Sequence, residues 1–222
     1  MSINKERYQE IVKELEPANV KLIAVSKTKP IEDIQALYDL GQRDFGENYV
    51  QELTEKAEQL PQDIRWHFIG HLQSNKVKSI APFVHLIHVG DSLKLLQEIN
   101  KQALKNNRII ACLLQIYIAK EETKFGLDKN ELDELINQFE NPDLKNVKIT
   151  GLMGMASFTE NMDTVRNEFR YLKSLFDKHA KLPTADSRLS TLSMGMSSDY
   201  KIAIEEGSNI VRIGSLLFGT RN

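Results

Sequence analysis

Lys27 stands directly after a short apolar run, in the segment AVSKTKP (residues 24–30). The residues before it are small or apolar, so its side chain starts where a buried strand ends. Partial burial disfavours the charged ammonium, lowers its pKa and frees some neutral amine. A neutral amine attacks an aldehyde to form a Schiff base. The alternative is a solvated lysine at a strand end, a description that fits Lys29 better.

A second candidate site lies near the other end of the chain, in GMSSD (195–199) and RIGSLLFG (212–219). Each segment runs from a strand end into a helix start and places small residues there, namely Ser197, Gly214 and Ser215. Helix N-termini bind phosphate through unpaired backbone N–H groups and the helix dipole. Two such starts at one mouth predict a phosphate site, whereas helix capping would explain either one alone.

Arg212 lies among apolar neighbours in NIVRIG (209–214), near the end of the last predicted strand. Alternation along a strand puts Ile210, Arg212 and Gly214 on one face. A buried guanidinium needs a partner. The sequence leaves two kinds of partner open, either a carboxylate elsewhere in the chain or an acceptor on a ligand bound near the phosphate site.

Together these features describe one ligand, pyridoxal 5′-phosphate (PLP). Its aldehyde suits Lys27, its phosphate suits the two helix starts, and its ring nitrogen suits Arg212 as a hydrogen-bond donor. An arginine beside that nitrogen keeps it unprotonated, because two adjacent cations repel. The ring is then a poorer electron sink than one paired with a carboxylate, so we expect weak or no carbanion chemistry.

Composition excludes several classes of protein. Formal net charge is −2, with 29 basic and 31 acidic residues, which gives no support for nucleic-acid binding. Cys112 is the one cysteine, inside an apolar run, so we expect an inert core thiol and no disulfide within the chain. The N-terminus is too charged for a signal peptide, and no apolar run approaches the ~20 residues of a membrane helix. We therefore expect a cytoplasmic protein with no membrane partner.

Short apolar runs alternate with longer amphipathic ones along the whole chain. The predicted strands are 21–26, 43–47, 65–70, 85–89, 109–118, 148–155, 191–195 and 209–214. The predicted helices are 2–16, 31–41, 48–59, 73–80, 92–106, 129–140, 161–180 and 198–206. In the helix over 92–106, Leu93, Leu96, Ile99 and Leu104 recur at roughly helical spacing, with Asp91 or Ser92 as its cap.

This alternation predicts right-handed βαβ units and a parallel sheet, closed into a barrel or open and doubly wound. No linker-like tract divides the chain, and eight repeats suit a small barrel. We therefore predict an α/β fold, a single (β/α)8 TIM barrel over residues 1–222 with an extra N-terminal helix. In such a barrel the functional residues gather where the strands end.

Two histidines, His67 and His71, stand in WHFIGHLQSNK (66–76). An acid–base pair or a metal site is the functional interpretation. No Asp, Glu or Cys stands at ligand spacing, so we expect no metal site. His67 alternates along a strand and is interpreted as a core residue, whereas the sequence leaves the role of His71 open.

Five segments in order resemble the pyridoxal phosphate homeostasis protein family: AVSKTKP, FGENYVQE (45–52), WHFIGHLQSNK, GLMGMAS (151–157) and residues 192–221. The resemblance implies one barrel of the type seen in the alanine racemase N-terminal domain, with PLP on Lys27. It further implies the remaining cofactor-binding residues: Asn48 near the cofactor, Ser197 and the Gly214–Ser215 backbone at the phosphate, and Arg212 at the pyridine nitrogen.

We therefore expect a protein that holds PLP as a Lys27 Schiff base and takes part in its intracellular homeostasis, by buffering it or delivering it to PLP-dependent apo-enzymes. A PLP-dependent, racemase-like enzyme is the alternative, and a Schiff-base aldolase for a phosphorylated sugar is a third hypothesis. Racemisation by two bases needs groups on both ring faces, and Lys27 is the one candidate. A sugar offers no acceptor matching Arg212. Since no strand-rich segment follows Arg221, we expect a monomer and assign no catalytic residue.

Overall fold

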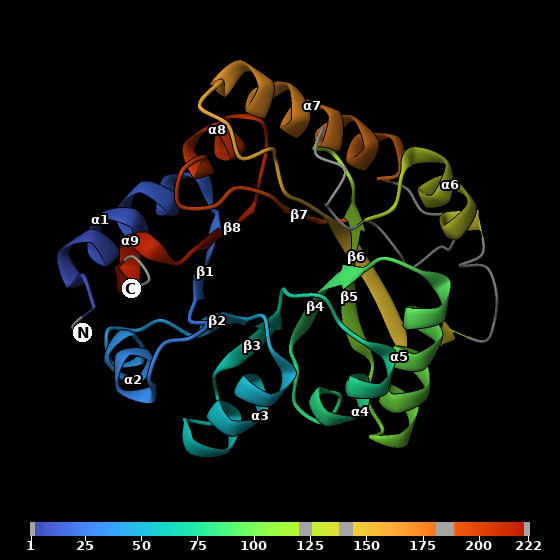
Figure 1. Cartoon of the computed structure of the whole chain (residues 1–222), viewed down its shortest axis with the longest axis horizontal. Coiled ribbons are helices and arrows are strands. Elements are labelled where there is room, and N and C mark those ends of the chain that lie inside the picture. Colours follow the sequence, from blue (N-terminus) through green and yellow to red (C-terminus); the bar gives the residue numbers. More distant parts are fainter. Residues whose placement is uncertain (1–2, 120–125, 138–143, 181–188, 220–222) are drawn as a thin grey trace.

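The structure, a computed structural model, describes residues 3–119, 126–137, 144–180 and 189–219. Its strands run parallel in sequence order around a closed barrel, and β8 pairs with β1 to complete it (Figure 1). The strands are β1 (Lys21–Val25), β2 (Asp44–Glu47), β3 (Arg65–Phe68), β4 (Leu86–Gly90), β5 (Ile110–Ile116), β6 (Val147–Gly154), β7 (Thr191–Ser193) and β8 (Ile210–Ile213). The predicted (β/α)8 barrel is confirmed, and all eight predicted strands correspond to observed ones.

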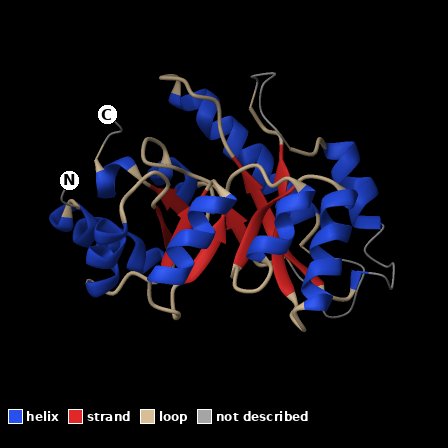
Figure 2. Cartoon of the chain, turned by 60° about the horizontal axis from the view of Figure 1, so that its bottom comes forward, coloured by secondary structure: helices blue, strands red, loops and turns tan. Residues whose placement is uncertain are grey.

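Helices surround the strands on the outside of the barrel (Figure 2). They are α1 (Lys5–Leu15), α2 (Ile31–Asp39), α3 (Val50–Gln59), α4 (Val77–Ile80), α5 (Leu93–Lys105), α6 (Lys129–Asn137), α7 (Met162–Lys178), α8 (Tyr200–Glu205) and α9 (Ser215–Phe218). The predicted extra N-terminal helix is α1, which lies beside α9, where the Asn4 N–H donates to the Leu217 carbonyl at 2.8 Å. Residue 2 and residues 138–140, the ends of two predicted helices, lie outside the described residues.

The segment over 73–80 differs from its prediction as one helix. It forms a 3₁₀ turn, η2 (Ser74–Lys76), followed by the single-turn helix α4. The first bond of the turn runs from the Lys76 N–H to the Gln73 carbonyl, an i→i+3 closure that tightens the backbone before α4 begins.

Helix α5 shows how the amphipathic pattern builds the outer layer. Ser92 caps it by accepting from the Leu95 N–H, and Leu96 and Ile99 are fully buried. Leu104, which we had placed in the same stripe, is 60% exposed. Eight residues separate Leu96 from Leu104, which rotates the second side chain by roughly 80° around the helix, away from the strands.

Two further predictions concern the interior and the surface. Cys112 is completely buried in β5, and burial raises the pKa of its thiol, so the interpretation as an inert core residue holds. Within the described ranges, none of the helices has the length and apolar character needed to cross a membrane.

The burial of α5 against the barrel generates a stability prediction. Leu96→Ala should lower the free energy of unfolding by about 2–5 kcal/mol, because it leaves a cavity under the helix. Leu104→Ala, on the exposed face of the same helix, should change it by less than about 0.5 kcal/mol. Urea unfolding of both variants measures the difference. Equal effects would contradict this packing of α5.

Candidate functional site

A cavity of about 430 Å³ opens at the carboxyl ends of the strands. Its lining includes all six residues that the sequence analysis proposed, namely Lys27, Asn48, Ser197, Arg212, Gly214 and Ser215. These residues come from four different strand ends and are up to 188 positions apart in the chain, between Lys27 and Ser215. Closure of the barrel brings them around one space.

Lys27 lies two residues beyond the end of β1 and is half-buried in the cavity wall. The backbone on both sides of it is held by α3. The Lys56 ammonium donates to the Ser26 carbonyl at 2.8 Å, and the Thr28 N–H donates to Glu52 Oε1 at 2.6 Å. Thr28 adopts a left-handed conformation, with φ of 63°, which turns the chain sharply after Lys27. The position of Lys27 is therefore fixed from outside the cavity.

The group that holds this turn is a buried ionic cluster of Glu47, Glu52 and Lys56. Lys56 Nζ lies 2.8 Å from Glu47 Oε1 and 2.6 Å from Glu52 Oε1, and Ser26 Oγ donates to Glu47 at 2.6 Å. Glu47 is completely buried, and burial raises its pKa to about 7, although Lys56 and Ser26 act in the opposite direction. The sequence analysis missed this cluster. The spacing of Glu52 and Lys56 on one helix face was the available signal.

Asn48 follows Glu47 directly and brings an amide to the cavity. Its Oδ1 is buried and has no hydrogen-bond partner, which is costly for a polar atom unless a ligand supplies a donor. Gly70 packs directly against the Asn48 backbone, and a Cβ at Gly70 would lie 2.2 Å from the Asn48 carbonyl oxygen. Only glycine fits at that point, so the packing of Gly70 against Asn48 fixes this part of the wall.

The two loops predicted to bind phosphate follow β7 and β8 and meet beside the end of β1. The Gly214 N–H donates to Ser197 Oγ at 3.3 Å, and Ser215 is the exposed first residue of α9. Gly195, with φ of 95°, makes the turn after β7 that places Ser197 there. At Gly195 a Cβ would also lie 2.5 Å from the Ala203 Cβ. As predicted, Ser197, Gly214 and Ser215 lie together at one cavity.

Arg212 is 4% exposed and its guanidinium is held by groups on β6 and β7. One terminal nitrogen donates to the Ser193 carbonyl at 2.9 Å and to Ser193 Oγ at 2.6 Å, and the other to the Gly154 carbonyl at 3.0 Å. Burial lowers its pKa to about 10, and the Asp199 carboxylate offsets part of that effect. The side chain therefore stays charged at neutral pH. Its direct partners are carbonyls and a hydroxyl, not the carboxylate considered from the sequence.

Lys29 is the cavity residue that the sequence analysis placed wrongly. We expected an exposed side chain, but it is half-buried and lines the cavity. Its ammonium donates to the carbonyls of Phe218 and Gly219, at 3.0 and 3.4 Å, which face it from the end of α9. Cations commonly bind free carbonyls at a helix C-terminus. The sequence around Lys29 contains no local pattern that predicts hydrogen-bond partners so distant in the chain.

Comparison with known proteins identifies relatives of this chain. Residues 4–222 match the family model described as alanine racemase, N-terminal domain. A pyridoxal phosphate homeostasis protein of Aquifex aeolicus is 46% identical over 202 residues, covering 90% of this chain and 87% of the relative. The human protein of the same name is 38% identical over 231 residues, covering 98% and 84%. The chain belongs to the pyridoxal phosphate homeostasis protein family.

A solved structure of similar sequence supports this assignment. PipY of Synechococcus elongatus PCC7942 is 35% identical to this chain, and the match covers 96% of this chain and 99% of that one. The TM-score is 0.89 for the structure without PLP and 0.87 for the structure with PLP bound. This chain therefore shares its fold with a relative whose structure has been solved both with and without PLP.

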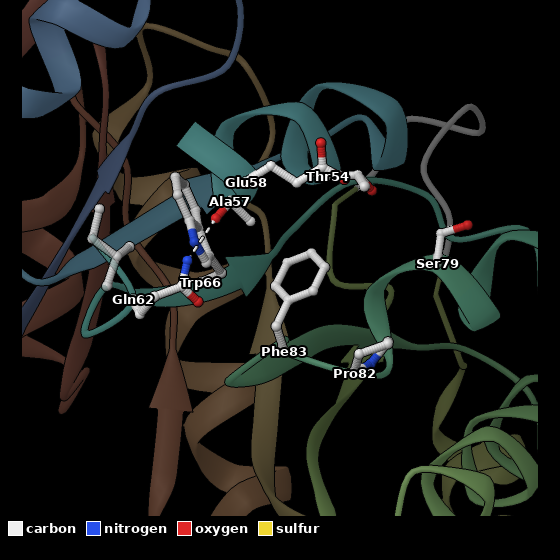
Figure 3. Close-up of a pocket in the computed structure, with 9 residues that line it drawn as sticks. Thr54, Ala57, Glu58, Gln62, Trp66, Ser79, Pro82 and Phe83 are labelled. Carbon is white, nitrogen blue, oxygen red and sulfur yellow. Dashed lines mark hydrogen bonds between the residues drawn. The ribbon is translucent and has the colours of Figure 1, made fainter. Parts of the chain in front are cut away.

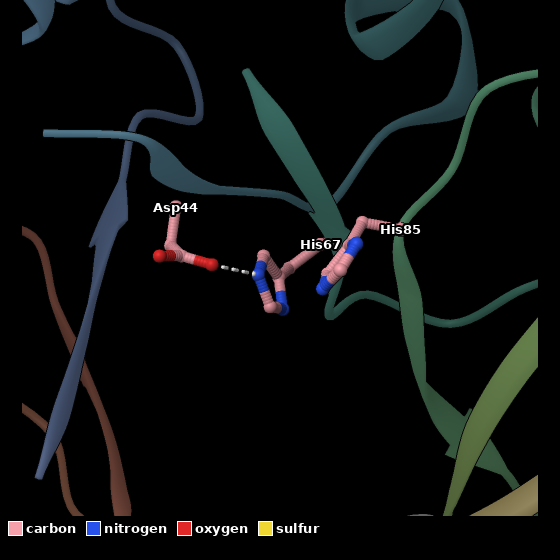
Figure 4. A group of neighbouring side chains, drawn as sticks. All are labelled: Asp44, His67 and His85. Atoms are coloured by element: carbon pink, nitrogen blue, oxygen red, sulfur yellow. Dashed lines mark hydrogen bonds and ion pairs between the residues drawn. The ribbon is translucent and has the colours of Figure 1, made fainter. Parts of the chain in front are cut away.

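His67, a candidate metal ligand in the sequence, lies with Asp44 and His85 at the amino-terminal side of the barrel (Figure 4). Their ligand atoms all lie within 4.8 Å of one another, but cations already occupy the carboxylate. Arg65 donates to both oxygens of Asp44, and Lys21 Nζ lies 3.8 Å from Oδ1. A metal ion would have to displace these cations, so we interpret the group as a hydrogen-bonded cluster. His67 is fully buried, as a core residue should be.

His71 lies outside the cavity lining. Its side chain is 51% exposed, and its Nδ1 lies 3.9 Å from Asp91 Oδ2. The role that the sequence left open is therefore not that of a wall residue of this cavity.

A second pocket, of about 350 Å³, lies between α3 and α4 (Figure 3). Trp66 and Phe83 give it an aromatic wall, and Thr54, Glu58 and Gln62 stand at its edge. It contains none of the family-implied residues and no buried charge. The residues that the family resemblance implies line the Lys27 cavity instead.

The raised pKa of Glu47 generates a prediction about stability and pH. The ordinary value of 4.5 applies to the unfolded chain and about 7 to the folded one, so the folded state binds more protons between these pH values. The free energy of unfolding contributed by Glu47 therefore falls as pH rises through that window, by roughly 3 kcal/mol. Glu47→Gln should remove this fall. Urea unfolding at several pH values between 5 and 8 measures it.

The control for this experiment is Glu58→Gln, which alters an exposed carboxylate on α3, the helix that carries Lys56, and should leave the pH profile unchanged. The comparison rests on the difference between variant and native profiles, so titration of the histidines cancels. A Glu47→Gln profile parallel to the native one across this range would show that Glu47 ionises normally.

Proposed function

We propose that this protein binds PLP in the Lys27 cavity as a Schiff base and takes part in intracellular PLP homeostasis, in the cytoplasm and as a monomer of one barrel domain. The observation that carries the proposal is the joint presence of Lys27, Arg212 and the Ser197–Gly214 contact around one cavity of about 430 Å³. The relatives named for PLP homeostasis, and PipY with PLP bound, support the same ligand.

Lys27 supplies the covalent link. Its neutral amine adds to the aldehyde carbon, the nitrogen loses its protons, and the aldehyde oxygen leaves as water, so that a C=N bond replaces the C=O bond. The contacts of Lys56 and Glu52 on either side of Lys27 hold the amine in place for this addition.

The other wall residues fit the remaining groups of the ligand. The first turn of α9 offers the N–H of Ser215 to a phosphate oxygen, and the Ser197 hydroxyl lies beside it. Lys29 adds a positive charge to the same wall. Asn48 has a buried Oδ1 without a donor, which the ring hydroxyl of the ligand can satisfy.

Arg212 decides what the bound ligand can do. It donates to the pyridine nitrogen and remains charged at neutral pH, since its pKa is about 10. A protonated ring nitrogen beside that charge is disfavoured, so the ring withdraws electrons weakly. We therefore propose a carrier that buffers PLP or delivers it to apo-enzymes, with no strong catalytic activity.

Borohydride trapping tests this function. PLP added to the protein should give a yellow band, and reduction should fix the ligand to the peptide that contains Lys27, as read by mass spectrometry. Lys27→Ala should abolish the band and the adduct. Lys29→Ala, which removes the other lysine of the cavity wall, is the matched control and should retain both, with weaker binding because a phosphate contact is lost.

Two outcomes would contradict the proposal. An adduct that maps to Lys29 or to surface lysines would remove Lys27 from its role. Rapid interconversion of L- and D-alanine by the loaded protein, lost in Lys27→Ala, would replace the carrier with a racemase.

A further inference from the structure

A row of buried polar side chains crosses the interior of the barrel from Asp44 to Arg212. Asp44 Oδ1 lies 2.9 Å from His67 Nε2, and His67 Nδ1 lies 3.0 Å from His88 Nε2. His88 Nδ1 then lies 3.2 Å from Ser193 Oγ, which accepts from Arg212 at 2.6 Å. Strands β4 and β7 are not neighbours in the sheet, so the contact of His88 with Ser193 passes through the barrel interior.

When both imidazoles are neutral, the carboxylate end fixes the direction of every hydrogen bond, and the guanidinium end agrees with it. An ionised carboxylate only accepts and a guanidinium only donates. Asp44 therefore receives the Nε2–H of His67, whose free Nδ1 receives the Nε2–H of His88. The Nδ1 of His88 receives the hydroxyl proton of Ser193, whose oxygen receives Arg212. No link in the series has two donors or two acceptors facing each other.

The ionisation states agree with this order. Burial works to raise the pKa of Asp44, but hydrogen bonds from Arg65 and His67 hold it well below its usual range. Burial lowers the pKa of His67 and, more strongly, that of His88. Both rings are therefore neutral at physiological pH. A buried imidazolium would also repel Arg212.

Such a row is unusual at these positions. The interior of a (β/α)8 barrel is ordinarily filled by layers of branched apolar side chains. His67, His88 and Ser193 are each 0% exposed, and each would leave an unpaired polar atom if its neighbour in the row were replaced by an apolar residue. Apolar residues would fill the space without that risk, so stability alone does not account for the row.

We propose that Asp44, His67, His88 and Ser193 form one directional hydrogen-bond chain that positions the Arg212 guanidinium at the cavity. Asp44, His67 and His88 act through Ser193 and are positioning residues. The existence of this hydrogen-bond chain does not depend on any ligand. Its effect on PLP rests on the function proposed above.

The hydrogen-bond chain can be tested first in the protein without PLP. Nitrogen-15 NMR of the imidazoles distinguishes the two neutral tautomers from the imidazolium. Both His67 and His88 should be neutral Nε2–H tautomers between pH 6 and 8. An Nδ1–H tautomer or an imidazolium at either position would reverse a link and overturn the proposal.

The second test asks whether the chain acts on Arg212. His88→Leu breaks it, whereas His88→Gln keeps a donor and an acceptor in the same order. We expect His88→Leu to weaken PLP binding about tenfold, because Arg212 loses an aligned acceptor, and His88→Gln to recover most of that loss. Ring-labelled [15N]PLP should report an unprotonated nitrogen in the native protein and in His88→Gln, and a partly protonated one in His88→Leu.

His85→Leu is the matched control. The His85 ring lies against His67, with ring centroids 5.3 Å apart, and forms no link in the chain, so both readouts should stay native. If native protein fails to bind PLP, the proposed function fails while the tautomer test still stands. If native protein binds PLP and His88→Leu is folded yet identical to it in affinity and ring protonation, the effect on Arg212 is refuted. If His88→Leu does not fold, His88→Gln and Ser193→Ala carry the comparison, and native readouts in Ser193→Ala refute the proposal equally.

Discussion

The parallel pairing of β1 with β8 closes the barrel, and its register sets Ile23 beside Arg212. The first and last strands thereby deliver their carboxyl ends to the same mouth. Lys27 follows one strand and the Gly214 turn follows the other, so an amine and the loop proposed to bind phosphate become neighbours across almost the whole length of the chain. The proposed site depends on this closure, because its amine and its phosphate-binding residues belong to different βα units.

Two buried charged groups stabilise the site from opposite sides, and they differ in construction. The Lys56 cluster is compact: its ammonium has three acceptors within 2.8 Å, and it restrains the turn around Lys27. The Arg212 guanidinium is held by carbonyls and a hydroxyl, and neutral groups connect that hydroxyl to Asp44 across the barrel. Buried ions are stable only when their hydrogen bonds are complete. The Lys56 ammonium meets that condition, whereas Glu47 Oε2 in the same cluster is buried without a hydrogen-bond partner. Neither arrangement places a carboxylate in the described lining of the cavity.

Much of the fold followed from the sequence, because eight apolar runs separated by amphipathic segments have few arrangements. The site residues were found where a local pattern marked them: Lys27 after a strand, and Ser197 and Gly214 at helix starts. Residues without such a pattern were missed or misplaced. Lys29 bonds to carbonyls 189 and 190 residues away, and the links of the interior chain join five different strands. Strand alternation placed His67 in the core correctly, but pairing across a barrel depends on register, which periodicity does not fix.

The groups around Arg212 bear on the carrier function proposed above. A carboxylate beside the pyridine nitrogen would favour its protonation and make the ring a strong electron sink. Here the guanidinium donates to carbonyls and a hydroxyl, and the Asp44 carboxylate stands at the amino-terminal end of β2, with His67, His88 and Ser193 between it and Arg212. The cavity keeps a donor and a positive charge but gains no proton acceptor from that carboxylate. In the function proposed above, the ligand is bound through its aldehyde, its phosphate and its nitrogen, while Arg212 keeps the ring from the chemistry that would consume it. Retention without turnover is what a store of a reactive aldehyde requires.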